Sequence, residues 1–295
     1  MRINPNQTPD LLAALNSVQK QRDDALLQLA TSRRVNKPSD DPAAAAQVII
    51  NHDRSSQADS FQSNISNVSG QQQAADSALA SVVTALQRAI TLGVQGGNSG
   101  TLSDANRAAI ADELRGVQSE LVSLANLSYQ GRFVFSGTEQ VTPYVVDNTV
   151  PSGVRYDGND GLNTVTIGNG YQLQVNLPGS QLFSSAGADV FQAMSDLITA
   201  VTNNTGVDAA LTSVRQAFDY VTAQRVFYGN GMNQMDAQKT FLDAQKTQLS
   251  SQENTLVGAD TAAAASQVVN TDTARNATLA AIGRISQNSL FDYLK

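Results

Sequence analysis

The sequence predicts a mainly α protein: an elongated rod of long antiparallel, coiled-coil-like helices, with a small β-rich insertion domain and a terminal helix pair. Three observations support this fold class. Apolar residues recur at alternating steps of four and three residues over most of the chain, which is the spacing of paired helices. In one stretch only, apolar residues instead recur at every second position, which is the spacing of a β-strand. Aromatic residues make up 5% of the chain and Trp is absent, which suits thin helical packing.

The longest uninterrupted pattern runs from Val207 to Leu256, and no Pro breaks it. A helix of about 50 residues is about 75 Å long, so it needs other long helices beside it. Its predicted contact line, here called the α seam, consists of Val207, Leu211, Val214, Phe218, Val221, Arg225, Tyr228, Met232, Met235, Lys239, Leu242, Lys246, Leu249, Glu253 and Leu256.

A first helix is predicted over residues 11–29, with Asp10 as its N-cap. Pro38 and Pro42 then interrupt it, because the residue before a proline avoids the α region. Asp41 as N-cap and Pro42 at the first helical position start the next helix, which runs to about Val94 and ends in glycines between Gly93 and Gly100. Its seam extends from Phe61 to Ala89.

Ser103 is expected to cap a third helix that stops near Gly131 and forms an antiparallel hairpin with the helix before it. Residues 132–137 then read as a strand. The alternating residues on either side of Gly168–Gly170, from Val165 to Leu177, predict a β-hairpin.

A short helix returns the chain to Val207, and Gly258 separates the long helix from a last helix that starts at about Asp260. Five segments result: an N-terminal assembly helix and linker (1–41), two parts of the helical rod (42–131 and 186–257), the β-rich insertion between them (132–185) and a C-terminal assembly helix (258–295).

The composition argues against catalysis. The net charge is −7, which does not favour nucleic acid or an anionic membrane, and Cys is absent. His52 is the one histidine and is expected at the surface, so neither a His-based metal site nor a Ser-His pair can form within one chain. No catalytic residue, cofactor or metal is predicted, and neither a cleavable signal peptide nor a membrane span is visible.

Residues Asp157–Gly161 (DGNDG) invite a calcium interpretation. An EF-hand loop needs a Glu at its twelfth position, where this sequence has Gly168. A β-turn is therefore the better prediction. The glycines between Gly93 and Gly100 are not followed by the Lys of a phosphate-binding loop.

The segment Arg34–Pro42 (RVNKPSDDP) resembles the N-terminal signature of flagellins and flagellar hook-associated proteins. Its signature positions are Arg34, Asn36, Pro38, Asp40, Asp41 and Pro42. The segments around Gln224 and Arg225 and over residues 280–294 resemble the C-terminal helices of the same family. Residues 131–138 (GRFVFSGT) and 142–144 are similar to the entry of the β domain in members that join hook to filament. Arg33 departs from the family, which usually has Gly there.

The resemblance implies a secreted, extracellular structural protein of the bacterial flagellum, exported through the type III channel without a cleaved signal. It would form a homo-oligomeric ring between hook-associated protein 1 and flagellin, with an export chaperone holding its C-terminal helix in the cytoplasm. Two alternatives stay open: a short flagellin that forms the filament itself, and a surface adhesin that binds through the β insertion.

The apolar stripes of the terminal helices are the predicted assembly interface. They could also be ordinary core that packs on the rod, but the breaks at Pro38–Pro42 and Gly258 argue against that. We expect them to be mobile in the monomer and to order against neighbouring copies. The interface residues are Leu11, Leu15, Val18, Leu26, Leu29, Leu279, Ile282, Ile285, Leu290, Phe291 and Leu294.

Overall fold

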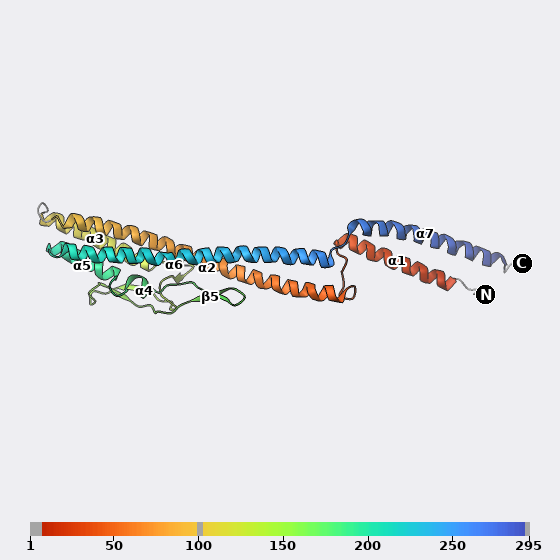
Figure 1. Cartoon of the computed structure of the whole chain (residues 1–295), viewed down its shortest axis with the longest axis horizontal. Helices are drawn as coiled ribbons and strands as arrows, with labels where there is room; N and C mark the ends of the chain where they lie inside the picture. The colour runs from red at the N-terminus through yellow and green to blue at the C-terminus, as the bar shows by residue number, and fades with distance from the viewer. Residues whose placement is uncertain (1–7, 99–102, 293–295) are drawn as a thin grey trace. The chain divides into compact units, whose positions relative to one another are not determined.

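The computed structural model describes residues 8–98 and 103–292, with the side chains of residues 9–98 and 103–284 (Figure 1). The predicted mainly α fold class is confirmed, because long helices account for most of these residues and the strands are short. The chain divides into two compact units. Unit 1 comprises residues up to 57 together with those from 244 onward, and unit 2 comprises residues 58–243.

The two longest helices are α2 (Pro42–Gly96) and α6 (Val207–Val257), close to the predicted bounds. Asp41 caps α2 as predicted, since its Oδ1 accepts a hydrogen bond from the Ala44 N–H at 3.0 Å. In unit 2 the helices are antiparallel. Gln62 near the start of α2 bonds to Asp243 late in α6, and Asp76 bonds to Arg225 further toward the middle.

The α seam is buried along one of its two heptad positions. Every seventh residue is buried: Val207, Val214, Val221, Tyr228, Met235, Leu242 and Leu249. At the other heptad position burial decreases along the helix: Leu211 is buried, Arg225 is half-buried and Lys239 is exposed. The predicted seam of α2 is buried almost throughout, from Ile65 to Ala89. One stretch of α2 is long and apolar enough to span a membrane by composition, and 44% of it is buried inside the protein.

Helix α3 (Asp104–Ala125) starts where predicted, because Ser103 Oγ accepts a hydrogen bond from the Asn106 N–H. The prediction that it extends to near Gly131 is wrong. Gln130 and Gly131 have φ angles of 51° and 79° and form the tight turn of a short hairpin, β1 (Ser128–Tyr129) with β2 (Arg132–Phe133). Two successive left-handed residues cannot continue an α-helix but match the primed turns of hairpins.

Of the glycines predicted to end α2, Gly96 is indeed its last residue, and both Gly93 and Gly96 also have a packing role. Gly93 lies inside the helix, and a Cβ there would be 2.6 Å from Leu211 Cδ2. A Cβ on Gly96 would be 2.8 Å from Val201 Cγ2, in helix α5 (Val190–Asn203). The absent side chains let α5 and α6 approach the end of α2 closely.

The insertion contains three two-stranded antiparallel sheets and helix α4 (Gly179–Phe183). The predicted hairpin is confirmed as β5 (Thr164–Gly168) with β6 (Tyr171–Gln174), whereas β3 (Tyr144–Val146) with β4 (Val154–Tyr156) was not predicted. The predicted strand 132–137 is wrong beyond Phe133. The Ser136 hydroxyl bonds to the carbonyls of Phe133 and Glu139 and turns the chain there, which buries Phe135 instead.

The insertion is bonded to the helices of unit 2. The buried Gln72 of α2 donates from Nε2 to the Val175 carbonyl at 2.6 Å, and the Leu177 N–H donates to the Tyr228 hydroxyl of α6. A cluster of aromatic rings continues the core into the insertion: Phe135, Tyr144, Phe183 and Phe191. The insertion therefore packs on the helices through two buried apolar clusters.

The terminal helices are α1 (Thr8–Thr31) and α7 (Thr261–Asp292). Asp10 is not the N-cap that was predicted, because α1 begins at Thr8 and places it in the first turn. Asp260 caps α7, accepting from the N–H groups of Ala262 and Ala263 at 3.0 Å, so the predicted start of this helix is confirmed.

Candidate assembly interface

Helices α1 and α7 of unit 1 lie side by side and antiparallel (Figure 1). Arg22 Nε of α1 donates to Asp272 Oδ1 of α7 at 2.7 Å, and both side chains are partly buried. The chain therefore pairs its own two terminal helices.

Small and polar residues line much of the contact between these two helices. On α1, Ala25 is buried and its neighbours on the predicted stripe are half-buried. On α7, Ala264 and Thr271 are buried, and Val268, Arg275, Thr278 and Ile282 continue the same four-and-three spacing half-buried. The fully buried residues of this contact are small and its larger apolar residues are only half-buried, so it removes less apolar area from water than a fully buried Leu seam would.

Five large apolar side chains of the pair stay exposed. Leu12 is 53% exposed, Val269 65% and Leu279 42%, and Leu26 and Leu27 are each 38% exposed. We name these five residues the outer apolar set. No other part of the described chain covers them.

The predicted interface residues thus fall into three groups. Leu11, Leu15, Val18, Leu29 and Ile282 are half-buried on the line where α1 and α7 meet, and Leu26 and Leu279 belong to the outer apolar set. The side chains of Ile285, Leu290, Phe291 and Leu294 lie outside the described residues. The predicted interface residues do not include Leu12, Leu27 and Val269. Each of these directly follows another apolar residue, and one stripe along a helix cannot contain both members of such a pair.

The linker between α1 and α2 is held together by the signature residues. Asp40 Oδ2 accepts hydrogen bonds from the N–H groups of Lys37 at 2.8 Å and Asn36 at 3.0 Å, which lower the pKa of its carboxyl. The Asn36 side chain donates to the Arg33 carbonyl. Pro38 lies in the turn that these bonds close, and Pro42 occupies the first position of α2.

Arg34 joins this linker to the end of α6. Its N–H donates to the Val257 carbonyl at 2.7 Å, and its Nη2 donates to the Leu256 carbonyl and to Asp41 Oδ2. The N–H of Ala44 and then Arg34 lower the pKa of Asp41. Val35 is buried against Ala44 and Val257. The signature therefore specifies a folded linker.

The departure from the family at Arg33 falls at the bend itself. The left-handed residue is Ser32, with a φ of 54°, and not position 33. Arg33 instead donates from Nη2 to Glu253 Oε1 of α6 at 2.7 Å. His52, exposed as predicted, lies 3.2 Å from the other oxygen of Glu253 through its Nε2.

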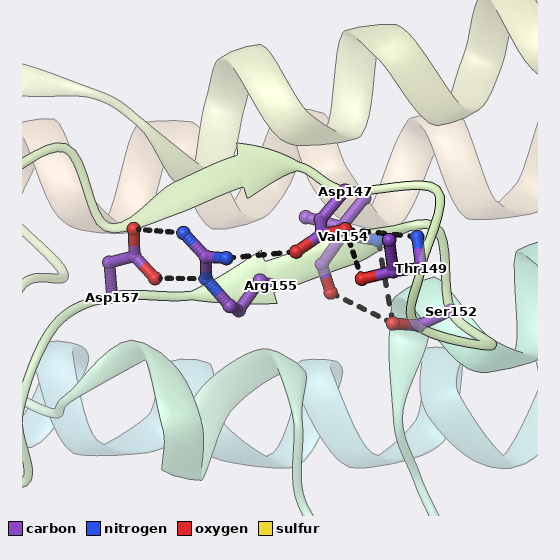
Figure 2. A network of polar contacts seen from close by, with 6 residues as sticks. All are labelled: Asp147, Thr149, Ser152, Val154, Arg155 and Asp157. Carbon is purple, nitrogen blue, oxygen red and sulfur yellow. Dashed lines mark hydrogen bonds and ion pairs between the residues drawn. The ribbon is translucent and has the colours of Figure 1, made fainter.

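In the loop considered for calcium, side-chain oxygens of Asp157 and Asn159 accept hydrogen bonds from other groups of the protein. Figure 2 shows Arg155 between two carboxylates, with Nε 2.6 Å from Asp157 Oδ1 and Nη1 2.9 Å from Asp147 Oδ2. The bonds from Arg155 lower the pKa of Asp157. Asn159 Oδ1 accepts from the N–H groups of Thr138 and Gly161. Within the described ranges, no group of three His, Cys, Asp or Glu is arranged for a metal ion.

Two family models match the chain at its two ends. Residues 5–140 match the bacterial flagellin N-terminal helical region, and residues 211–294 match the bacterial flagellin C-terminal helical region. Flagellar hook-associated protein 3 of Salmonella typhimurium is 33% identical over 162 residues, which are 54% of this chain and 49% of that protein. The match thus spans about half the length of this curated relative.

Solved structures support the same fold. A Vibrio parahaemolyticus protein assigned to the flagellar hook-associated proteins has a TM-score of 0.67 at 22% identity, covering 74% of this chain and 99% of that chain. FlgL of Bacillus cereus has a TM-score of 0.60 at 23% identity, covering 70% and 99%.

Paired terminal helices, long central helices and these matches define a flagellar structural protein. The chain belongs to the flagellin and flagellar hook-associated protein family.

Proposed function

We propose that this protein forms the junction between the flagellar hook and the flagellin filament, as a ring of identical copies between hook-associated protein 1 and flagellin. The similarity to hook-associated protein 3 of Salmonella typhimurium supports this role. The proposed role is structural, without catalysis or a cofactor.

The observation that carries the proposal is the outer apolar set on α1 and α7. Its five residues are exposed in a single chain, and the opposite faces of these helices are already used in their mutual contact. Neighbouring copies and adjoining flagellar proteins would cover these five side chains. Burying their apolar surface favours association. The half-buried residues Leu11, Leu15, Val18, Leu29 and Ile282 would then hold the pair together inside the assembly.

Because the pair is thinly packed, we infer that it is marginal in the free monomer and becomes fully ordered when copies stack. Amide hydrogen exchange on dilute monomer tests this. Residues 11–29 and 268–284 should exchange much faster than the centre of α2. Equally strong protection of both regions would contradict the inference.

Leu279→Asp tests the interface. Leu279 is 42% exposed, so the monomer should fold normally, whereas an assembled interface would have to desolvate the new charge. We expect normal circular dichroism and loss of incorporation into flagella. Leu279→Met, which keeps an apolar side chain of similar volume at the same position, is the matched control and should assemble. Ile282→Asp should also stop incorporation while the helices of unit 2 keep their fold, but it loosens the α1–α7 pair as well. Normal filament attachment with Leu279→Asp would contradict the proposal.

The surrounding steps are part of the same proposal: type III export to the extracellular flagellum without a cleaved signal, and a chaperone on the C-terminal helix in the cytoplasm. A deletion strain tests the junction role directly. It should make hooks but release flagellin unattached into the medium.

A short flagellin is the second candidate, because the two matching family models describe flagellin regions. Copy number separates the two roles. Immunogold labelling confined to the hook end supports the junction, whereas labelling along the whole filament supports the flagellin.

A further inference from the structure

The α seam carries a charged residue, Glu253, in the penultimate turn of α6, where its spacing calls for an apolar one. In the structure, side chains from two other segments flank this carboxylate. Arg33 of the linker donates to Oε1 at 2.7 Å, and His52 of α2 lies 3.2 Å from Oε2. The Glu253 side chain is only 24% exposed. Both oxygens are therefore used by segments distant in the sequence.

In the same region, the two non-helical connections of unit 1 lie next to each other. Arg33 and Gly258 form an antiparallel bridge, in which the Arg34 N–H donates to the Val257 carbonyl and the Ala259 N–H donates to the Ser32 carbonyl at 3.0 Å. The connection from α1 to α2 and the connection from α6 to α7 are thus paired by backbone hydrogen bonds.

The bend at this bridge is strained. Ser32 has a φ of 54°, a left-handed conformation that is unfavourable for a residue with a Cβ. Such a conformation persists only where the surroundings hold it. The residue next to it, Arg33, provides a side-chain bond from this bend to α6.

We propose that Arg33, Glu253 and His52 form a latch that keeps the two connections of unit 1 paired and the Ser32 bend closed. The latch is a conformational device of this chain, and it does not depend on the proposed junction role. When it opens, the bridge between Arg33 and Gly258 weakens, and the linker becomes a hinge between α1 and α2.

Native-state amide exchange at Arg34 and Ala259 tests the latch, because these two N–H groups form the bridge. Glu253→Ala and Arg33→Ala should each raise their exchange rates about three- to fivefold, the range expected for a partly exposed ion pair. The double variant should exchange no faster than Glu253→Ala. His52→Gln, which keeps a hydrogen-bond donor at this position, should have a smaller effect.

Arg88→Ala is the matched control, because it breaks a comparable Arg–Glu pair with Glu113 in unit 2. It should leave both amides unchanged. Trypsin cleavage after Arg33 or Arg34 is an independent measurement, and it should be faster in Glu253→Ala than in the Arg88→Ala control. Unchanged exchange and cleavage in Glu253→Ala, or an equal rise in Arg88→Ala, would overturn the latch.

Discussion

The contact between α2 and α6 in unit 2 and the contact between α1 and α7 in unit 1 use the same four-and-three spacing with different side chains. The first buries Leu79, Leu86 and Val221, and also receives side chains from α3, α5 and the insertion. The second centres on Ala25, Ala264 and Thr271, and its outer side is bare. Spacing determines that two helices pair. The size of the side chains, and the presence of a third layer, determine whether the pair is stable alone.

The largest expected difference between the regions comes from deleting a core side chain. Leu86→Ala should lower the unfolding free energy of unit 2 by about 3 kcal/mol, because it leaves a cavity in a fully packed site. Leu12→Ala in the outer apolar set should change the unfolding free energy of unit 1 by less than about 0.5 kcal/mol. Urea unfolding measures both. If both variants lost a similar amount of unfolding free energy, the proposed difference between the two helix contacts would be wrong.

A smaller effect is expected at Asn51 of α2. This residue is 2% exposed, and its Nδ2 has no hydrogen-bond partner, while its Oδ1 accepts from Gln47. Asn51→Leu should stabilise this part of α2 by about 1 kcal/mol, because an unsatisfied buried donor is removed. Exchange of the α2 amides around position 51 reports the change, and faster exchange would show that the amide has an essential partner.

The linker of unit 1 should respond to acid. Hydrogen bonds from backbone N–H groups lower the pKa of Asp40 and Asp41 below the ordinary value of 3.8. Their stabilising contribution is therefore complete above about pH 3.8 and is lost as the pH falls through the lowered values. Protection factors of the Asn36, Lys37 and Ala44 amides should fall as the pH drops below about 3.8. In the double variant Asp40→Asn and Asp41→Asn, these factors should be low already and vary less with pH.

The smallest effect concerns a glycine inside a helix. A Cβ on Gly116 of α3 would meet no atom within 4 Å, so Gly116→Ala should stabilise unit 2 by roughly 0.5–1 kcal/mol. Gly93→Ala, where the Cβ would meet Leu211, is the contrasting variant and should gain less or lose stability. Thermal unfolding of both variants checks whether open space decides the outcome.

The sequence alone predicted the long helices, the caps at Asp41 and Ser103, the start of α7 near Asp260, and the β5–β6 hairpin. These features follow from local chemistry: apolar spacing, capping oxygens and turn glycines act within a few residues. The family signature was also visible in the sequence, but its purpose was not, because Arg34 is bonded to carbonyls more than 220 positions away.

Only the tertiary structure decided which apolar residues remain bare. Leu11 and Leu12, or Val268 and Val269, are equivalent by composition, and the rotation of α1 against α7 places one of each pair inward and the other outward. The same holds for Gly93 and for Glu253. In each case the outcome depends on atoms from a distant segment, and no local pattern records that neighbour.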